Sequence, residues 1–305
     1  MTVANPSRTP YPADVALCLE FLTDPREFLA AAGEHLAQNP VQNTVVTTTA
    51  ERLLRGEKGA PDDWWLVVRD GPEVVGAGMR TAPFPPRPAF LLRMSDAAAR
   101  LLARTLYERQ ESLAGLNGAL PTVRLCADEL ARLTGGTVEV AVHTRLFELL
   151  EVIPPARPEG HLRAGSVEDC ELAMAWFAAF MADADDQAGR PPGSSPHETP
   201  DRKSMMMRIE SGWLWFWVNG AGDPVHLTSV GPVSFGAARL GPVYTPPEHR
   251  GRGYASAAVA QISQRILDQG ARPCLFTDQA NPTSNRIYQA IGYQPVTDMA
   301  NLLIR

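Results

Sequence analysis

The chain has 305 residues, 45% of them hydrophobic and 20% charged, and its formal net charge is −6. This length and apolar content allow a large core and favour two domains over one. An acidic chain disfavours general nucleic-acid binding, because neutralising phosphates requires a basic surface. The four cysteines are scattered without CxxC spacing, so we expect no metal site. No signal-like N-terminus and no apolar run of roughly 20 residues is present. We therefore expect a cytoplasmic protein without a membrane partner.

The first half of the chain alternates between helical and extended segments. Residues 12–60 are predicted to be helical, because charged residues separate their apolar positions. The later predicted elements are two strands joined at Asp70-Gly71-Pro72, a third strand within 84–94, helices over 95–110 and 121–136, and a strand over 137–150.

The second half repeats this order after a proline-rich linker at 153–160. Its predicted elements are a strand and helix cap at 161–170, helices over 171–184 and 201–212, a loop over 188–200, strands over 213–219, 226–230 and 237–245, a helix over 253–270, a strand over 272–279 and a helix over 281–293. The adjacent strands predict an α/β fold with a mixed sheet and helices on its faces. The repeat rests on element order alone, because the residues themselves show none.

A basic, glycine-rich turn, Arg250-Gly251-Arg252-Gly253, joins the strand at 237–245 to the following helix. The first N–H groups of a helix lack internal partners, and the helix dipole makes this end favourable for phosphate. Gly251 and Gly253 permit positive φ and a close approach to the backbone. Arg250 and Arg252 add positive charge for a pyrophosphate or a ribose phosphate. The turn fits neither the Walker loop nor the dinucleotide fingerprint.

Pro246 and Pro247 are predicted to end the preceding strand, because proline cannot donate to a ladder. If the neighbouring strand continues, a gap opens in the sheet. Free backbone groups of Val243, Tyr244 and Thr245 would then pair with an extended, amide-bearing ligand. Coenzyme A combines such an arm with a pyrophosphate.

A second motif begins at Asn281, which is predicted to cap a helix with Pro282 in its first position. Asn281, Ser284 and Tyr288 are three and four residues apart and therefore share a helix face. A phenol beside small polar residues can donate a proton to a thiolate leaving group.

The two motifs together resemble the GCN5-related N-acetyltransferases. Arg250-x-x-Gly253-x-Ala255 is similar to that family's pyrophosphate loop, and the segment from Asn281 to Tyr293 is similar to its N-x-x-A-x-x-x-Y-x-x-x-G-F pattern, with Ser284 replacing Ala and Tyr293 replacing Phe. The resemblance covers roughly Leu240 to Val296. It implies an acyl-CoA N-acyltransferase-like fold, which the repeated order extends to two tandem copies.

The resemblance also implies site roles. Acetyl-CoA would be the co-substrate, with an amine of a small molecule or peptide as acceptor, and Tyr288 would protonate the departing thiolate. The implied cofactor-binding residues are Val243, Tyr244, Thr245, Arg250, Gly251, Arg252, Gly253, Tyr254, Ala255, Ser256, Asn281 and Ser284.

The general base is left open by the sequence. Many relatives carry a strand glutamate before the loop, but the strand GAARLGPVYT has no carboxylate. Glu248, Asp278 and His226 are candidates, but a solvated charge is the more ordinary explanation for Glu248 and a core or edge histidine for His226, while Asp278 fits a structural role equally well. Deprotonation through water is a further option. A non-catalytic acyl-CoA sensor or a nucleotide-phosphate binder is the alternative function.

The first half lacks a glycine-rich turn before its helix at 95–110. We therefore expect residues 1–152 to form a degenerate acetyltransferase-like domain without coenzyme A, and residues 161–305 to form the catalytic domain. An unrelated α/β domain is the alternative for the first half. Asp183, Asp185 and Asp186 are candidates for attracting a cationic acceptor, although solvated carboxylates are the more ordinary explanation. A homodimer is one option for the assembly.

Overall fold

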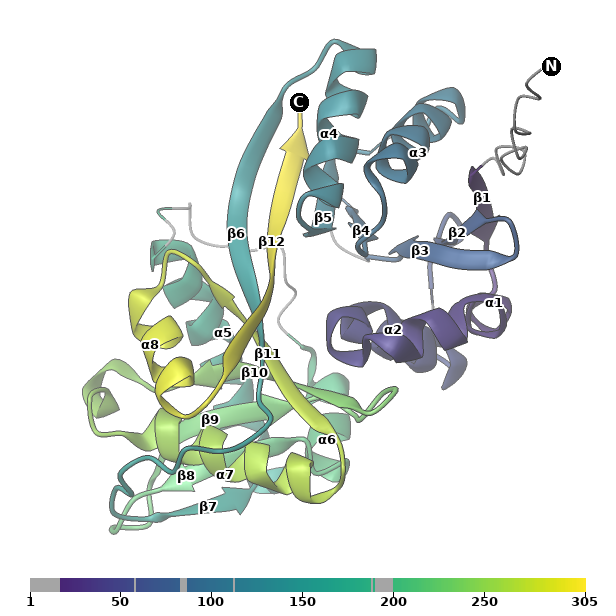
Figure 1. Cartoon of the computed structure of the whole chain (residues 1–305). Coiled ribbons are helices and arrows are strands. Elements are labelled where there is room, and N and C mark those ends of the chain that lie inside the picture. The colour runs from purple at the N-terminus through teal and green to yellow at the C-terminus, as the bar shows by residue number, and fades with distance from the viewer. Residues whose placement is uncertain (1–16, 58, 83–86, 112, 188, 190–199) are drawn as a thin grey trace, which may run out of the picture.

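The two halves of the chain fold with the same order of elements, which confirms the predicted repeat (Figure 1). The computed structural model describes residues 17–57, 59–82, 87–111, 113–187, 189 and 200–305, so the predicted loop 188–200 lies almost wholly outside the described residues. The first half contains β1 (Leu17–Leu22), α1 (Pro25–Gln38), α2 (Pro40–Leu54), β2 (Trp64–Asp70), β3 (Glu73–Arg80), β4 (Ala89–Leu91), α3 (Asp96–Glu108), β5 (Gly115–Ala119), α4 (Thr122–Thr134) and β6 (Val138–Glu148). The second half contains β7 (His161–Ala164), the 3-10 turn η1 (Val167–Asp169), α5 (Cys170–Gln187), α6 (Arg202–Glu210), β8 (Leu214–Val218), β9 (Pro224–Val230), β10 (Ala237–Tyr244), the 3-10 turn η2 (Pro247–His249), α7 (Tyr254–Asp268), β11 (Arg272–Asp278), α8 (Pro282–Ala290) and β12 (Gln294–Ile304).

All twelve of these strands form one mixed sheet in the order β1-β2-β3-β4-β5-β12-β6-β11-β10-β9-β8-β7. The last strand of each half is exchanged with the other half: β12 pairs with β5 and β6, and β6 pairs with β11. Figure 1 shows β6 and β12 as long neighbouring strands through the middle of the molecule. The predicted linker 153–160 lies between β6 and β7, but each half needs a strand of the other to continue its sheet.

The prediction of helix over 12–60 is wrong at residues 17–22, which form the edge strand β1. This strand pairs antiparallel with β2, and Leu17, Leu19 and Phe21 pack on the core that β2 shares with α3 and α4. The Phe21 ring meets the Trp64 ring edge-on at a centroid distance of 5.2 Å. The alternation in LCLEFL is a period-two pattern, which is typical of a half-buried strand.

Each half buries both faces of its strands. In the first half, the core with α3 and α4 contains Trp64, and the core with α1 and α2 contains Trp65, because successive strand residues point to opposite faces. In the second half, α7 and α8 cover one face and α5 and α6 cover the other. Trp213, Trp215 and Trp217 are alternate residues of the chain, and they pack together into the α7 side of the core, where Trp217 is fully buried.

Helix α2 of the first half also packs on strands of the second half. Val41 shares a buried cluster with Ala237 of β10 and Cys274 of β11. Phe235 packs against the core of α1 and α2. Because α2 lies on the face opposite α7 and α8, the first half forms part of that side of the β10–β11 region.

We expect Gly118→Ala to destabilise the fold severely. Gly118 has φ 142°, and a Cβ there would lie 2.0 Å from the Leu91 carbonyl oxygen, so β4 and β5 would have to separate. The expected loss in the free energy of unfolding is about 3 kcal/mol. Gly135→Ala is the control, because Gly135 has φ 73° but open surroundings, and it should cost only about 1 kcal/mol. Urea unfolding measures both losses; equal losses would contradict the close strand contact.

Candidate functional site

The N-terminus of α7 presents backbone N–H groups without a capping side chain. The first helical bond runs from the Ala257 N–H to the Gly253 carbonyl at 3.1 Å, and Gly253 supplies no side chain as a cap. Gly251 and Gly253 have φ 74° and 83°, and a Cβ at either would meet nothing within 4 Å. The predicted positive φ values are confirmed. This open turn leaves the amides of residues 254–256 available to an anion.

A gap opens between β10 and β11 and extends toward this turn, where Arg250 donates to the Thr245 carbonyl. The two strands pair in parallel from Ala237↔Arg272 to Leu240↔Leu275 and then part. Strand β10 has a register shift between Leu240 and Val243 and then follows β9 as far as Tyr244. Strand β11 follows β6 to Asp278.

The predicted origin of this gap at Pro246 and Pro247 is wrong. The strands separate earlier, at Gly241 and Pro242, where the register of β10 shifts and proline has no N–H for a ladder. The gap therefore runs alongside Val243 and Tyr244. Backbone groups of Val243 and Tyr244 that face β11 have no partner strand there, and these are the groups predicted to pair with an extended ligand.

The two arginines of the turn are already held by neighbouring groups. Arg250 donates through Nε to the Thr245 carbonyl at 3.0 Å and pairs with Asp183 of α5. Arg252 is exposed and donates to the Glu248 carbonyl at 3.3 Å. Arg250 therefore ties the turn to β10 and α5, and Arg252 is the freer cation for a phosphate.

Helix α8 carries the polar residues of the second motif. The Asn281 Oδ1 atom accepts from the Ser284 N–H at 3.0 Å, which confirms the predicted cap, and its amide donates to Gln187 Oε1 at 2.7 Å. Tyr288 is 8% exposed and meets the Tyr293 ring edge-on. No residue in the described part of the chain hydrogen-bonds to the Tyr288 hydroxyl. Burial raises the pKa of Tyr288, so this hydroxyl keeps its proton at neutral pH.

Asn285 belongs to the same region but was not predicted from the sequence. Its Oδ1 atom accepts from the Thr277 hydroxyl at 2.5 Å, and its amide donates to the carbonyls of Asp278 and Asn281 at 3.2 and 2.9 Å. These bonds fix the start of α8 against the end of β11. The sequence signal that could have identified Asn285 is its spacing of four residues from Asn281, which places both on one face of the helix.

The three candidate bases lie in different surroundings. Glu248 is exposed on η2, and the Asp278 carboxylate accepts from the Ala280 N–H at 2.8 Å. His226 is fully buried, with Nδ1 2.7 Å from the Thr245 hydroxyl and Nε2 2.7 Å from the Thr228 hydroxyl. Both ring nitrogens are therefore engaged, and His226 positions Thr245 at the end of the gap.

Acidification is expected to destabilise the fold through His226. Burial lowers the pKa of His226 from 6.5 to about 3. Because the unfolded chain then binds more protons, the free energy of unfolding should fall as pH drops below about 6.5 and level off near about 3, with a slope approaching ~1.4 kcal/mol per pH unit. Urea unfolding of the wild type and His226→Gln across this range measures the slope. Equal slopes in the two proteins would rule out His226 as the cause.

The three aspartates near the end of α5 do not form a common acidic surface. Asp183 pairs with Arg250, Asp185 is 1% exposed and Asp186 is exposed. A shared role in attracting a cationic acceptor therefore has no support in this arrangement.

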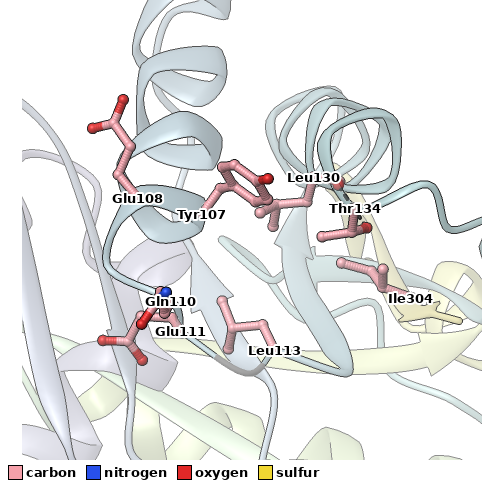
Figure 2. Close-up of a pocket in the computed structure, with 8 residues that line it drawn as sticks. All are labelled: Tyr107, Glu108, Gln110, Glu111, Leu113, Leu130, Thr134 and Ile304. Atoms are coloured by element: carbon pink, nitrogen blue, oxygen red, sulfur yellow. Dashed lines mark hydrogen bonds between the residues drawn. The ribbon is translucent and has the colours of Figure 1, made fainter.

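Helix α3, which the repeated element order matches to α7, has a capped N-terminus. The Ser95 hydroxyl accepts from the Ala98 N–H at 3.2 Å, and Asp96 places a carboxylate in the first turn of α3. A cavity of about 480 Å³ in this half lies at the other ends of α3 and α4, where the helix dipoles are negative (Figure 2). Its lining includes Glu108 and Glu111. These features disfavour phosphate binding in the first half.

Comparisons with known proteins agree with this fold. Residues 234–301 match the family model described as FR47-like protein. The structure is similar to a GCN5-related N-acetyltransferase from Sphaerobacter thermophilus, with TM-score 0.58, 14% identity and 94% of both chains covered. It is also similar to a GNAT-family acetyltransferase from Colwellia psychrerythraea, with TM-score 0.53, 12% identity and coverage of 94% of this chain and 99% of the other.

A third similar structure is a tandem GNAT protein from the clavulanic acid biosynthesis pathway, solved without AcCoA, with TM-score 0.53, 15% identity and coverage of 95% of this chain and 98% of the other. No curated protein matches the chain in sequence. The chain therefore has the fold of the GCN5-related N-acetyltransferases over nearly its whole length, and the predicted resemblance and fold class are confirmed.

The described residues contain neither a membrane-spanning helix nor a metal-binding group. No helix there has the length and apolar character needed to cross a membrane. No group of three or more histidine, cysteine or acidic residues there is arranged to hold a metal ion.

Proposed function

We propose that the chain transfers an acetyl group from acetyl-CoA to an amine, and that residues 161–305 supply the donor site. The open N-terminus of α7 beside the β10–β11 gap carries this proposal. It offers amides for a pyrophosphate and a strand edge for an amide-bearing arm within one short segment. The fold is that of acetyltransferases, as the similar structures indicate.

The chain would act mainly by orienting the two reactants. Amides of residues 251–256 would bind the donor's pyrophosphate, and the backbone of Val243 and Thr245 would bind its arm. Because the Thr245 carbonyl is occupied by Arg250 and its hydroxyl lies at His226, the amide of Thr245 is the group left for the donor. Fixing the donor in this gap makes the attack by the amine effectively unimolecular.

Tyr288 would supply the proton that the leaving group needs. The amine nitrogen forms a bond to the thioester carbonyl carbon, and the carbon–sulfur bond breaks with its electrons moving to sulfur. The Tyr288 hydroxyl, which is protonated and has no partner among the described residues, would donate to that sulfur. Since both ring nitrogens of His226 are engaged and the Asp278 carboxylate accepts a backbone N–H, we propose that water removes the proton of the amine.

A non-catalytic acyl-CoA sensor is the second candidate, favoured because β10 carries no carboxylate that could act as the base. Thiol release from acetyl-CoA across a panel of small amines and peptides separates the two functions. Turnover with any amine supports the enzyme. Binding of acetyl-CoA without turnover supports the sensor, and no binding of acetyl-CoA contradicts both.

A further inference from the structure

Three arginines from separate elements gather where α2 of the first half meets the second half. Arg239 lies on β10, Arg208 on α6 and Arg52 on α2. Arg208 is close enough to the other two for their positive charges to lower its pKa, after the larger effect of burial. Burial likewise lowers the pKa of Arg239, with Arg52 adding to the effect. We call these residues the arginine cluster.

The arginine cluster lacks enough counter-charge among the described residues. The Arg239 Nη1 and Arg208 Nε atoms are buried without a hydrogen-bond partner. Arg208 otherwise reaches the Ser229 hydroxyl at 3.4 Å and lies 5.7 Å from the Phe177 ring centre. The carboxylate next to the arginine cluster is that of Glu57, which forms an ion pair with Arg52 at 3.1 Å. Three guanidinium groups and one carboxylate leave two positive charges uncompensated.

Such an arrangement is costly unless an anion completes it. A guanidinium nitrogen that is buried without a hydrogen-bond partner is destabilising, although the Arg208 and Arg239 side chains as a whole are only partly buried. Arginine keeps its charge even when burial lowers its pKa, so the cost cannot be avoided by losing a proton. The planar guanidinium group matches the two oxygens of a carboxylate or a phosphate.

The position of Arg239 relates the cluster to the proposed donor site. Arg239 lies two residues before Gly241, where β10 and β11 part, which is about 7 Å along a strand. Its neighbour Ala237, two residues away on the same face, packs against Val41 of α2. Leu240 and Val243 instead pack on the α7 side. The cluster therefore lies next to the gap on the face opposite α7 and α8.

We propose that the arginine cluster binds an oxyanion, a carboxylate or a phosphate, on the acceptor, so that the preferred acceptor is an amine that also carries a negative charge. This assignment of the acceptor rests on the proposed acetyl transfer. A donor held from the α7 side leaves the opposite face for the amine. The oxyanion would bind at Arg239 and Arg208, with Arg52 adding charge from the other half of the chain.

Matched acceptor pairs test the proposal. The pairs are β-alanine against β-alaninamide, and phosphoethanolamine against ethanolamine, in which one member of each pair lacks the anion. For at least one pair, kcat/KM should be at least tenfold higher for the anionic member in the wild type. This preference should fall below twofold in Arg239→Gln and Arg208→Gln. Arg100→Gln is the control, because Arg100 is exposed on α3, and it should keep the preference.

Other results would overturn the proposal. Equal rates within both pairs, or a preference that survives in Arg239→Gln, would exclude binding of the acceptor at the cluster. If Arg239→Gln does not fold, Arg52→Gln replaces it, since the Arg52 side chain is 46% exposed, and it should reduce the preference at least threefold.

A second readout separates this proposal from the proposed function. If no amine in the wider panel is acetylated, the melting temperature is measured with inorganic phosphate or acetate at constant ionic strength. If the anion raises the melting temperature of the wild type but not of Arg239→Gln, the oxyanion site is supported even though the proposed acetyl transfer is not. The same change in both proteins, or none, would reject the site itself.

Discussion

Tyr288→Phe is expected to lower kcat for acetyl transfer by about 100-fold, the usual contribution of a general acid. The substitution removes only the hydroxyl, which makes no hydrogen bond within the described part of the chain and keeps its proton at neutral pH. The ring would still pack against Tyr293, so the affinity for acetyl-CoA and the free energy of unfolding should change little. Steady-state thiol release measures kcat, and urea unfolding measures stability.

Tyr293→Phe is the matched control for this prediction. Tyr293 is a buried tyrosine whose ring lies 5.9 Å from that of Tyr288, but its hydroxyl is hydrogen-bonded to Ser263 at 2.8 Å. Its loss should cost about 1–2 kcal/mol of stability, because the Ser263 hydroxyl is left buried without a partner, while kcat stays close to the wild-type value. If both variants lose kcat equally, Tyr288 does not act as the proton donor.

Gly253→Val is expected to weaken acetyl-CoA binding by at least about 100-fold, since it removes both the left-handed turn and the space in front of the helix amides. Gly253 has φ 83°, and the space beside it is open, so the fold can tolerate the side chain at the cost of backbone strain. A valine there would stand where the pyrophosphate is proposed to bind. Equilibrium dialysis with labelled acetyl-CoA measures the affinity.

Gly270→Val is the control that distinguishes the effect of backbone strain from the effect of blocking the proposed phosphate site. Gly270 follows the other end of α7, has φ 74°, and also has open surroundings. Both variants should lose about 1–2 kcal/mol of stability, the cost of a left-handed conformation for an L-residue. Gly253→Val alone should lose binding. Similar affinities in the two variants would place the phosphate site elsewhere.

The sequence predicted those parts of the site that depend on local chemistry. Glycines before a helix, and asparagine followed by proline at another helix start, determine the backbone over a few residues. The structure has positive φ at Gly251 and Gly253 and a cap at Asn281, as these patterns predict. Most of the repeated element order was also predictable from the hydrophobic period and end signals of each element, but the strands β1, β5 and β12 were not predicted.

The features that depend on distant parts of the chain could not be predicted in this way. The exchange of β6 and β12 is determined by pairing across the whole sheet, and neither strand carries a signal for its partner. The gap begins at Gly241 and Pro242 because β10 changes register against β9, which a single strand cannot show. The arginine cluster brings together residues 52, 208 and 239, which are far apart in the sequence. In the sequence alone, Arg239 is a single charge within an otherwise apolar strand, so nothing indicates its partners.

The stoichiometry of acetyl-CoA binding tests the central claim most directly. Calorimetric titration of the full chain should show one binding event per chain, because α7 has an open helix end whereas α3 is capped by Ser95 and carries Asp96. The event should be lost in Gly253→Val and retained in Gly270→Val. Two events per chain, or one that persists unchanged in Gly253→Val, would contradict a single donor site at the start of α7.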